Sequence, residues 1–404
     1  MNTIPTPINR VHDVNRVHDV NRVHDVNAVE SVSLVCHPGV FLIEQDYEII
    51  LLCNKPAMAS VVVDGRTFTD NINGVMRSDT DVHKIKVPVA LLDRARAYRV
   101  HITPLADHCN YYPKPDPTEA YEYPFTPVPA EGDVKAYVLA DTHGQVTVPA
   151  ETALAHGPID LLLLLGDIGD SAANKDQVTT LHRLTSEITE GRFPAVYIRG
   201  NHDTRGYMAE HLHQYIPTRN GATYYTFRAG CLWGVVLDCG EDKPDTSIEY
   251  GSLEYGGVAD FLGFREGQTV YLRGLIQHAD TTYNAAGITR RVALCHINFT
   301  RTDRPFNDHN PALYEKWIGC LNEMGIDMLI CGHEHRVGRQ PDDYFHGDPT
   351  PKFPTLLTSA HCDNPQPLRG GHAPGEYTGT ALTFTEEGVK YVFTNHKGEE
   401  LDFS

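Results

Sequence analysis

The stretch Val138-Leu139-Ala140-Asp141-Thr142-His143 is an apolar strand that ends on a carboxylate and an imidazole two residues apart. Side chains alternate along a strand, so Asp141 and His143 lean to the same side where the strand gives way to a loop. Two metal ligands can therefore come from three residues. Because an Asp-x-His triplet is common by chance, its meaning depends on what the rest of the chain brings to it.

Four later apolar runs end in the same way, each on side chains that can bind a metal ion. In open α/β folds, ligands gather outside the carboxyl ends of the strands, so these residues are expected to converge. Strand ends are polar in most proteins, and a single one would carry little weight. Five such ends, three of them with an adjacent glycine, predict a metal site. The later runs and the polar residues that follow them are 161–165 with Asp167 and Asp170, 195–199 with Asn201, His202 and Asp203, 292–295 with His296, and 328–331 with His333, Glu334 and His335.

The ligand types also select the chemistry. Carboxylate, imidazole and amide oxygen without a thiolate suit Mn, Fe, Zn or similar divalent ions. Seven candidate ligands are too many for one tetrahedral ion and suit two ions that share a carboxylate. Two ions about 3.5–4 Å apart stabilise the attacking and leaving oxygens of an in-line phosphoryl displacement. The residues alone therefore predict hydrolysis of a phosphoester.

In order and spacing these residues resemble the calcineurin-like metallophosphoesterase superfamily. The resemblance implies an α/β fold in the form of a four-layer α/β/β/α sandwich. It covers about residues 135–403 and rests on Asp141-Thr-His143, Gly166-Asp167-x-x-Asp170, Gly200-Asn201-His202-Asp203, His296 and Gly332-His333-x-His335.

The resemblance also implies a role for each ligand, with Asp167 bridging two metal ions. A hydroxide that bridges the same ions would be the nucleophile of the expected reaction. The implied ligands are Asp141, His143, Asp167 and His335 for one ion, and Asp167, Asn201, His296 and His333 for the other.

His202 is implied to be the general acid or leaving-group stabiliser rather than a ligand, with Asp170 orienting its ring. The alternative for His202 is a purely structural loop histidine. Arg205 is a candidate to bind a phosphate oxygen of the substrate, and a surface salt bridge is an equal alternative. The segment 240–257, which begins after an apolar run, is a candidate substrate-recognition rim or a contact with the N-terminal region.

The N-terminal third of the chain is organised differently. In residues 1–30 a hexapeptide, Asn-Arg-Val-His-Asp-Val, is repeated three times. Valine at every third position fits neither the helix nor the strand period, so we predict an N-terminal extension. Metal binding by His12, His18 and His24 is the alternative.

Residues 31–103 contain short strand-like runs, with a hairpin turn at Asp64-Gly65, and predict a small all-β sandwich of the immunoglobulin or fibronectin type. Proline and tyrosine dominate residues 104–132, which predict a linker. Residues 133–404 are the predicted catalytic domain. Its expected helices are 149–156, 174–189, 207–215 and 311–324, and its expected strands are 135–140, 159–165, 195–198, 222–227, 231–237, 292–295, 327–331, 355–359, 380–384 and 390–394.

A β-sandwich followed by such a domain also resembles purple acid phosphatases. Those proteins have Asp-x-Gly where this chain has Asp141-x-His143, and a tyrosine where it has Asp170. The iron redox pair and the colour are therefore not expected here.

Composition limits the partners and the compartment. The formal net charge of −19 disfavours non-specific binding to nucleic acid or to anionic membrane. Nine scattered cysteines, no secretory signal pattern and no long apolar run predict a cytoplasmic protein.

Two functions remain open to test. The expected substrate is a small phosphate monoester or diester, and the residues do not choose between them. The competing hypothesis is a non-catalytic scaffold that uses the same fold to bind proteins. Such a scaffold tends to lose ligands or the catalytic histidine, and this chain keeps them all.

Overall fold

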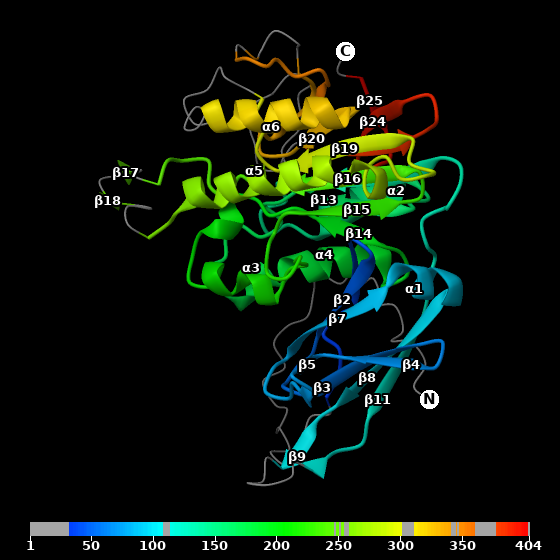
Figure 1. Ribbon diagram of the computed structural model, residues 1–404. Coiled ribbons are helices and arrows are strands. Elements are labelled where there is room, and N and C mark those ends of the chain that lie inside the picture. The colour runs from blue at the N-terminus through cyan, green and yellow to red at the C-terminus, as the bar shows by residue number, and fades with distance from the viewer. Residues whose placement is uncertain are drawn as a thin grey trace.

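The computed structural model describes residues 32–107, 114–245, 248–249, 252–253, 258–300, 311–340, 345, 347–359 and 377–402. These residues form two large β-sheets that pack face to face, with helices on both outer faces (Figure 1). The predicted extension over residues 1–30, with its three histidines, lies outside the described residues, as do residues 108–113 of the predicted linker.

The first sheet has nine strands in the order β25-β24-β23-β12-β13-β14-β1-β2-β7. At its centre, β12 runs parallel to β13 and β13 to β14, whereas β23 runs antiparallel to β12. The central strands are continuous apolar runs because both of their faces are covered. They and their C-terminal neighbours are β12 (Val134–Leu139), β13 (Leu161–Leu164), β14 (Ala195–Tyr197), β23 (Thr378–Phe384), β24 (Val389–Asn395) and β25 (Glu400–Leu401).

The second sheet has six strands in the order β15-β16-β19-β20-β22-β21. Its inner strands β16, β19, β20 and β22 are parallel, and β15 and β21 pair antiparallel at the two sides. The parallel strands therefore all end at the same border of the sheet. The six are β15 (Tyr225–Ala229), β16 (Leu232–Leu237), β19 (Arg290–Cys295), β20 (Met328–Cys331), β21 (Arg336–Arg339) and β22 (Thr355–Ser359).

Alternating side chains of these strands build two further cores outside the one between the sheets. On β12, Val138 packs between the sheets, whereas Tyr137 and Leu139 face the helices α2 and α4. On β19, Leu294 packs between the sheets and Cys295 faces α5 and α6. The predicted four-layer α/β/β/α sandwich is thus confirmed (Figure 1). The helices are α2 (Thr147–His156), α3 (Lys175–Val178), α4 (Thr180–Thr189), α5 (Phe261–Gln277) and α6 (Pro311–Met324).

The N-terminal region is strand-rich, as predicted, and three of its strands join the nine-stranded sheet. β1 runs parallel to β14, and β2 and β7 continue the sheet beyond it. A four-stranded sheet, β11-β8-β3-β4, packs on these strands through the core that also separates the two large sheets. In Figure 1 this blue and cyan part projects from the main body. The elements are β1 (Gly39–Ile43), β2 (Asp46–Leu52), β3 (Met58–Val63), β4 (Arg66–Thr69), β7 (Val82–Pro88), α1 (Val89–Ala95), β8 (Ala97–Thr103) and β11 (Glu119–Pro124).

The predicted hairpin at Asp64-Gly65 is confirmed, because Val63 pairs with Arg66 across the turn. The stretch predicted as a linker differs from expectation, since its second half is β11, antiparallel to β8. Tyr123 of β11 is buried and stacks on Tyr98, with ring centroids 5.1 Å apart. The boundaries between the predicted domains stay a prediction.

Smaller elements and several unexpected ones complete the description. The elements absent from the predicted ones include β1, α1, β21 and α5. The helix predicted over 174–189 is divided into α3 and α4, and the one predicted over 207–215 is a 3-10 helix, η2. In the described part of the chain, no helix is both long and apolar enough to cross a membrane. The remaining elements are β5 (Asn71–Ile72), β6 (Val75–Met76), β9 (Leu105–Asp107), β10 (Lys114–Pro115), η1 (His202–Thr204), η2 (Ala209–Gln214), β17 (Ile248–Glu249), β18 (Ser252–Leu253) and η3 (Ala279–Thr281).

Candidate metal centre

The seven predicted ligands lie just after the carboxyl ends of five parallel strands, three in one sheet and two in the other. The parallel strands of each sheet end at one border, so the loops that follow them meet between the sheets. The ligands are Asp141 and His143 after β12, Asp167 after β13, Asn201 after β14, His296 after β19, and His333 and His335 after β20.

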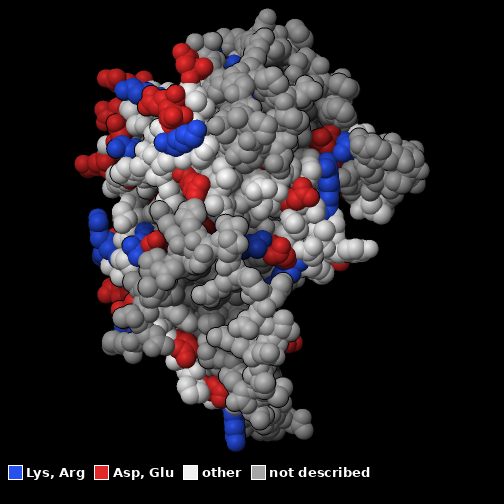
Figure 2. All heavy atoms as spheres, turned by 180° about the vertical axis from the view of Figure 1, so that it is seen from behind, with Lys and Arg blue, Asp and Glu red and all other residues white. Residues whose placement is uncertain are grey.

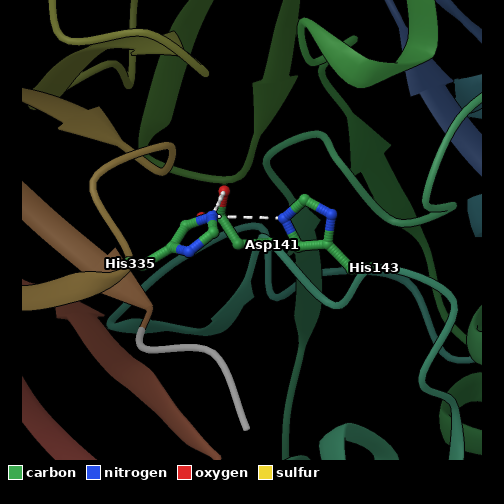
Figure 3. A group of neighbouring side chains, drawn as sticks. All are labelled: Asp141, His143 and His335. Atoms are coloured by element: carbon green, nitrogen blue, oxygen red, sulfur yellow. Dashed lines mark hydrogen bonds and ion pairs between the residues drawn. The ribbon is translucent and has the colours of Figure 1, made fainter. Parts of the chain in front are cut away.

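One group of ligands consists of Asp141, His143 and His335 (Figure 3). His143 Nε2 lies 3.1 Å from His335 Nε2, and His335 Nε2 lies 3.5 Å from Asp141 Oδ1. One ligand atom from each residue falls within 4.8 Å of the others. Two imidazole nitrogens and a carboxylate oxygen that converge in this way can hold a divalent ion.

A second group consists of Asp167, His296 and His333, with Asn201 beside them. His296 Nε2 lies 3.1 Å from Asp167 Oδ2, and Asn201 Oδ1 lies 3.0 Å from both His296 Nε2 and His333 Nδ1. His296 Nδ1 contacts the Leu165 carbonyl at 2.5 Å, which aims Nε2 at the other ligands. This group can also hold a divalent ion, and it is the more deeply buried of the two.

The orientation of Asn201 tests whether these residues fit a cation. Its Oδ1 faces the ring nitrogens of His296 and His333. Hydrogen bonding alone would favour the opposite orientation, in which the amide nitrogen donates to those rings and to Asp167, and the oxygen accepts from Arg205 Nη2 at 3.0 Å. The observed orientation gathers oxygen and nitrogen lone pairs around one point, as a bound cation requires. The donor set therefore fits a metal ion.

The backbone is held in an unusual conformation at this site. Asp141, His143, Asp167, His333 and His335 all have positive φ, between 44° and 68°. Such left-handed residues are costly outside glycine and persist where the surrounding structure enforces them, often at functional sites. Close backbone approach adds to this, because a Cβ at Gly200 would overlap the Asp167 carboxylate. A glycine is thus required at position 200, because any larger residue would collide with Asp167.

Opposite charges and burial shift the pKa values of the ligands. Burial raises the pKa of Asp167, but the facing His296 lowers this pKa by a larger amount. The pKa of Asp167 therefore lies well below its ordinary range. Burial lowers the pKa of His296, but Asp167 and Asp141 raise it to about 10. Burial lowers the pKa of His143 to about 4 and that of His333 to about 3. His143 and His333 are therefore neutral at pH 7 with lone pairs to offer, and a cation would replace a proton on His296.

His202 lies beside the ligands, at the start of η1. Its backbone N donates to Asp167 Oδ1 at 2.9 Å, and its ring meets that of His143 edge to face, with centroids 4.6 Å apart. The predicted contact with Asp170 is made by a different atom than expected. His202 Nδ1 lies 2.8 Å from the Asp170 backbone carbonyl, while the Asp170 carboxylate turns to His143 Nδ1 at 3.5 Å.

Arg205 lies in the same loop, and Nη1 is 3.1 Å from His202 Nε2. The rest of its guanidinium is held by two acids, of which Glu241 is buried. Nε and Nη2 donate to the two carboxylate oxygens of Glu241 at 2.8 and 2.6 Å, and Nη2 donates to Asp242 Oδ1 at 3.1 Å. Asp242 also lies 3.8 Å from His333 Nε2. Arg205 is thus fixed in a bidentate ion pair and still faces the candidate acid.

A buried carboxylate, Asp203, supports the loop that carries Asn201. Asp203 Oδ2 accepts from Gly200 N at 2.8 Å, from Asp167 N at 3.3 Å and from the Tyr197 hydroxyl at 2.7 Å. Burial and the nearby Asp167 raise the pKa of Asp203 to about 6. This residue ties the ends of β13 and β14 together.

Residues 134–337, just over half of the chain, match the family of calcineurin-like phosphoesterases. The chain belongs to that family. It is accordingly a metal-binding hydrolase that acts on phosphoesters, and the resemblance stated on the sequence motifs is confirmed. Among curated proteins, no sequence matches the chain.

Solved structures place this calcineurin-like phosphoesterase among known folds. The purple acid phosphatase PPD1 of yellow lupin is 11% identical, with a TM-score of 0.56 over 91% of this chain and 73% of its own. A dimetal phosphatase of Danio rerio is 13% identical, with a TM-score of 0.41 over 68% of this chain and 100% of its own. A structure titled PhoD is 12% identical, with a TM-score of 0.46 over 88% of this chain and 91% of its own. The likeness to the lupin protein shows the fold, including strands before the phosphoesterase region.

Sequence reasoning gave no role to Asp203 or Glu241. Asp203 was within the Gly200-Asn201-His202-Asp203 motif, but a strand end predicts a ligand more readily than a support for the loop. Glu241 follows β16, whose end was not counted among the ligand-bearing strands. The signal available in the sequence was an acidic pair, Glu241-Asp242, which begins four residues after the apolar run that ends at Leu237.

Proposed function

We propose that this phosphoesterase binds two divalent metal ions, Mn, Fe, Zn or similar, and hydrolyses a small-molecule phosphate monoester or diester. The observation that carries the proposal is the junction of the two ligand groups. His296 Nε2 lies 3.1 Å from Asp167 Oδ2 in one group and 3.8 Å from Asp141 Oδ1 in the other. The two ligand groups therefore adjoin, and Asp167 would hold both ions.

Seven residues are proposed as metal ligands. One ion would be held by Asp141, His143, Asp167 and His335, and the other by Asp167, Asn201, His296 and His333. When bound, two such ions supply an acidified water as nucleophile and neutralise charge on the phosphoryl oxygens. All seven positions are fixed by loops at strand ends, which keeps them in place before substrate arrives.

His202 is proposed to protonate the leaving oxygen through Nε2. Its Nδ1 contacts the Asp170 carbonyl, so Asp170 would orient the ring through its backbone rather than its carboxylate. Arg205 Nη1, which faces His202 Nε2, is proposed to move to a phosphate oxygen when substrate binds. Its ion pair with Glu241 limits the directions in which it can point.

The negative net charge of the molecule bears on what attracts a phosphate ester to it. On the face seen in Figure 2, the described acidic and basic side chains are interspersed in small groups. The formal net charge of −19 supports a metal centre, rather than a basic surface, as the attraction for the phosphate. Non-specific binding to nucleic acid is therefore not part of the proposal.

The proposal is tested by metal analysis of the purified protein, followed by assays of phosphate monoesters and diesters with Mn, Fe, Zn, Ni and Co. We expect about two ions per chain and hydrolysis of at least one ester class. Asn201→Ala and His296→Ala should abolish hydrolysis while the fold survives, whereas His101→Ala, on β8, serves as the matched histidine control. Full activity in either ligand variant contradicts the dinuclear assignment. No turnover with any of these metals would favour the non-catalytic scaffold.

A further inference from the structure

A cavity of 1040 Å³ lies between the loop after β14 and the beginning of α5. Its volume is at the upper end of the range typical of small-molecule sites, roughly 300–1,000 Å³. On one side the cavity is lined by loop residues that include Thr204, Arg205 and Tyr207. On the other side it is lined by residues around the start of α5, which include Val258, Phe261 and Phe264.

This cavity adjoins the candidate metal centre through Arg205. Arg205 lines the cavity, and its Nη1 lies 3.1 Å from His202 Nε2, the atom proposed to protonate the leaving oxygen. A phosphate bound at the ligands would therefore direct its leaving group past His202 toward this space.

The walls of the cavity combine the aromatic side chains Tyr207, Phe261 and Phe264 with charged residues, of which Glu210 and Asp260 are acidic. Tyr207 is 93% exposed and Val258 is 79% exposed, so both side chains are accessible to a ligand in this cavity. Phe264 carries the guanidinium of Arg199 on its ring at 5.2 Å, and Arg199 is paired with Asp238 at 2.7 Å. Since Arg205 is paired as well, both cations of the wall are neutralised by acids outside the cavity.

Both walls are held in place without a ligand. Ala172 N donates to the Arg205 carbonyl at 2.7 Å, and Met208 N donates to the Ala172 carbonyl at 2.8 Å, on either side of Tyr207. At the other wall, Asp260 Oδ1 caps α5 by accepting from Gly263 N at 2.9 Å. A site with preformed walls pays little ordering cost when it binds.

We propose that this cavity binds an aromatic leaving group, so that the substrate is a phosphate ester of a ring-bearing alcohol. The inference rests on the proposed function, because it assigns the leaving-group side of the same reaction. Tyr207 supplies the exposed ring on which the leaving group stacks. Stacking of one ring pair corresponds to roughly two- to twelvefold in affinity.

The experiment compares two non-hydrolysable probes, benzylphosphonate and methylphosphonate, by calorimetric titration of the Mn²⁺-loaded protein. The expected result is about fivefold tighter binding of benzylphosphonate. Tyr207→Ala should bring this ratio close to one, and Tyr207→Phe, which keeps the ring, should retain most of it. Val270→Ala removes an apolar side chain that is 70% exposed on α5 outside the cavity, and it should leave the ratio unchanged.

A ratio near one in the wild type, or an unchanged ratio in Tyr207→Ala, would overturn the inference. The phosphonates are not turned over, so the ratio is measured even if the wild type hydrolyses no ester. Absence of hydrolysis counts against the proposed function, whereas loss of the benzyl preference counts against the aromatic site alone.

Discussion

The strands β12, β13 and β14 and the strands β1, β2 and β7 belong to one sheet but use their polar residues differently. The first three deliver Asp141, Asp167 and Asn201 to the candidate metal centre. In the second three, the buried Glu48 and the partly buried Lys84 pair with each other at 3.3 Å and bind a loop of the phosphoesterase region. Polar groups therefore serve chemistry in one half of the sheet and attachment in the other.

Variants that affect activity in one half of the sheet and stability in the other test this difference. The largest effect is expected for Asp167→Asn, which removes the carboxylate proposed to bind both ions. We expect kcat/KM to fall by about 10⁴-fold, or roughly 5 kcal/mol, because charge stabilisation by both ions is weakened. Metal content should fall in parallel, measured by elemental analysis. Thermal unfolding of the metal-free protein should also occur at a lower temperature, because the buried His296 loses its ion-pair partner. Normal activity would contradict the role of Asp167.

In the other half of the sheet, Lys84→Met should cost stability and spare activity. Lys84 Nζ donates to the Ile216 carbonyl at 2.7 Å and to Thr218 Oγ1 at 2.9 Å beside the buried Glu48. Loss of the cation leaves Glu48 buried and unpaired, which costs about 3 kcal/mol. Urea unfolding measures the loss, and the double variant Glu48→Gln/Lys84→Met should recover part of it. A lower kcat with unchanged stability would mean that the two halves are not separable in this way.

A pH dependence of stability is expected from His182, which lies on α4 and packs against Phe41 of β1. Its Nε2 donates to the Tyr215 carbonyl at 2.6 Å, and its buried Nδ1 has no hydrogen-bond partner. Burial lowers the pKa of His182 from 6.5 to about 4, so the unfolded chain binds the proton more readily than the folded one.

The stabilisation is therefore complete above pH 6.5 and is lost as pH falls from 6.5 toward 4. Between pH 7.5 and pH 5 we expect a loss of about 2 kcal/mol attributable to His182. Urea unfolding at both pH values tests this, with His182→Gln as the control that lacks the titrating ring. An equal pH dependence in the two proteins would refute the assignment.

The smallest effect is expected at the Asp64-Gly65 turn, which joins β3 and β4 in the four-stranded sheet of the N-terminal region. Gly65 has φ of 74°, and a Cβ there would meet no atom within 4 Å, so only the backbone conformation opposes substitution. Gly65→Ala should destabilise the protein by about 1 kcal/mol, and Gly65→Asn by less, without altering kcat/KM. Thermal unfolding and an ester assay together check this outcome.

The ends of the central strands could be predicted from sequence because apolar runs and ligand-type residues meet there at fixed spacing. The long helix α5 could not be predicted in the same way. Its buried face includes Arg265, Gln268 and Thr269, so the apolar repeat that marks a helix is missing. Arg265 is stabilised there by the Cys239 carbonyl, to which it donates at 2.6 Å, and such a long-range partner is invisible in the sequence.

For the candidate site, the sequence indicated which residues take part, but not which of their atoms contact one another. Sequence motifs brought Asp170 and His202 together but could not tell the carbonyl of Asp170 from its carboxylate. The prolines near Tyr123 suggested an extended linker, whereas alternation of the same tyrosines produced a sheet strand, β11. Arg205 was predicted with a salt bridge as an equal alternative, and the structure gives it one with Glu241 while leaving it beside His202.

The parallel pairing of β1 with β14, in register at Phe41 and Ala195, has a consequence for any attempt to isolate the phosphoesterase region. A protein shortened to begin at residue 133 would leave the outer N–H and C=O groups of β14 without strand partners. An exposed strand of this kind recruits other chains and promotes aggregation. The N-terminal strands thus act as a built-in cover that keeps the phosphoesterase sheet from associating with itself.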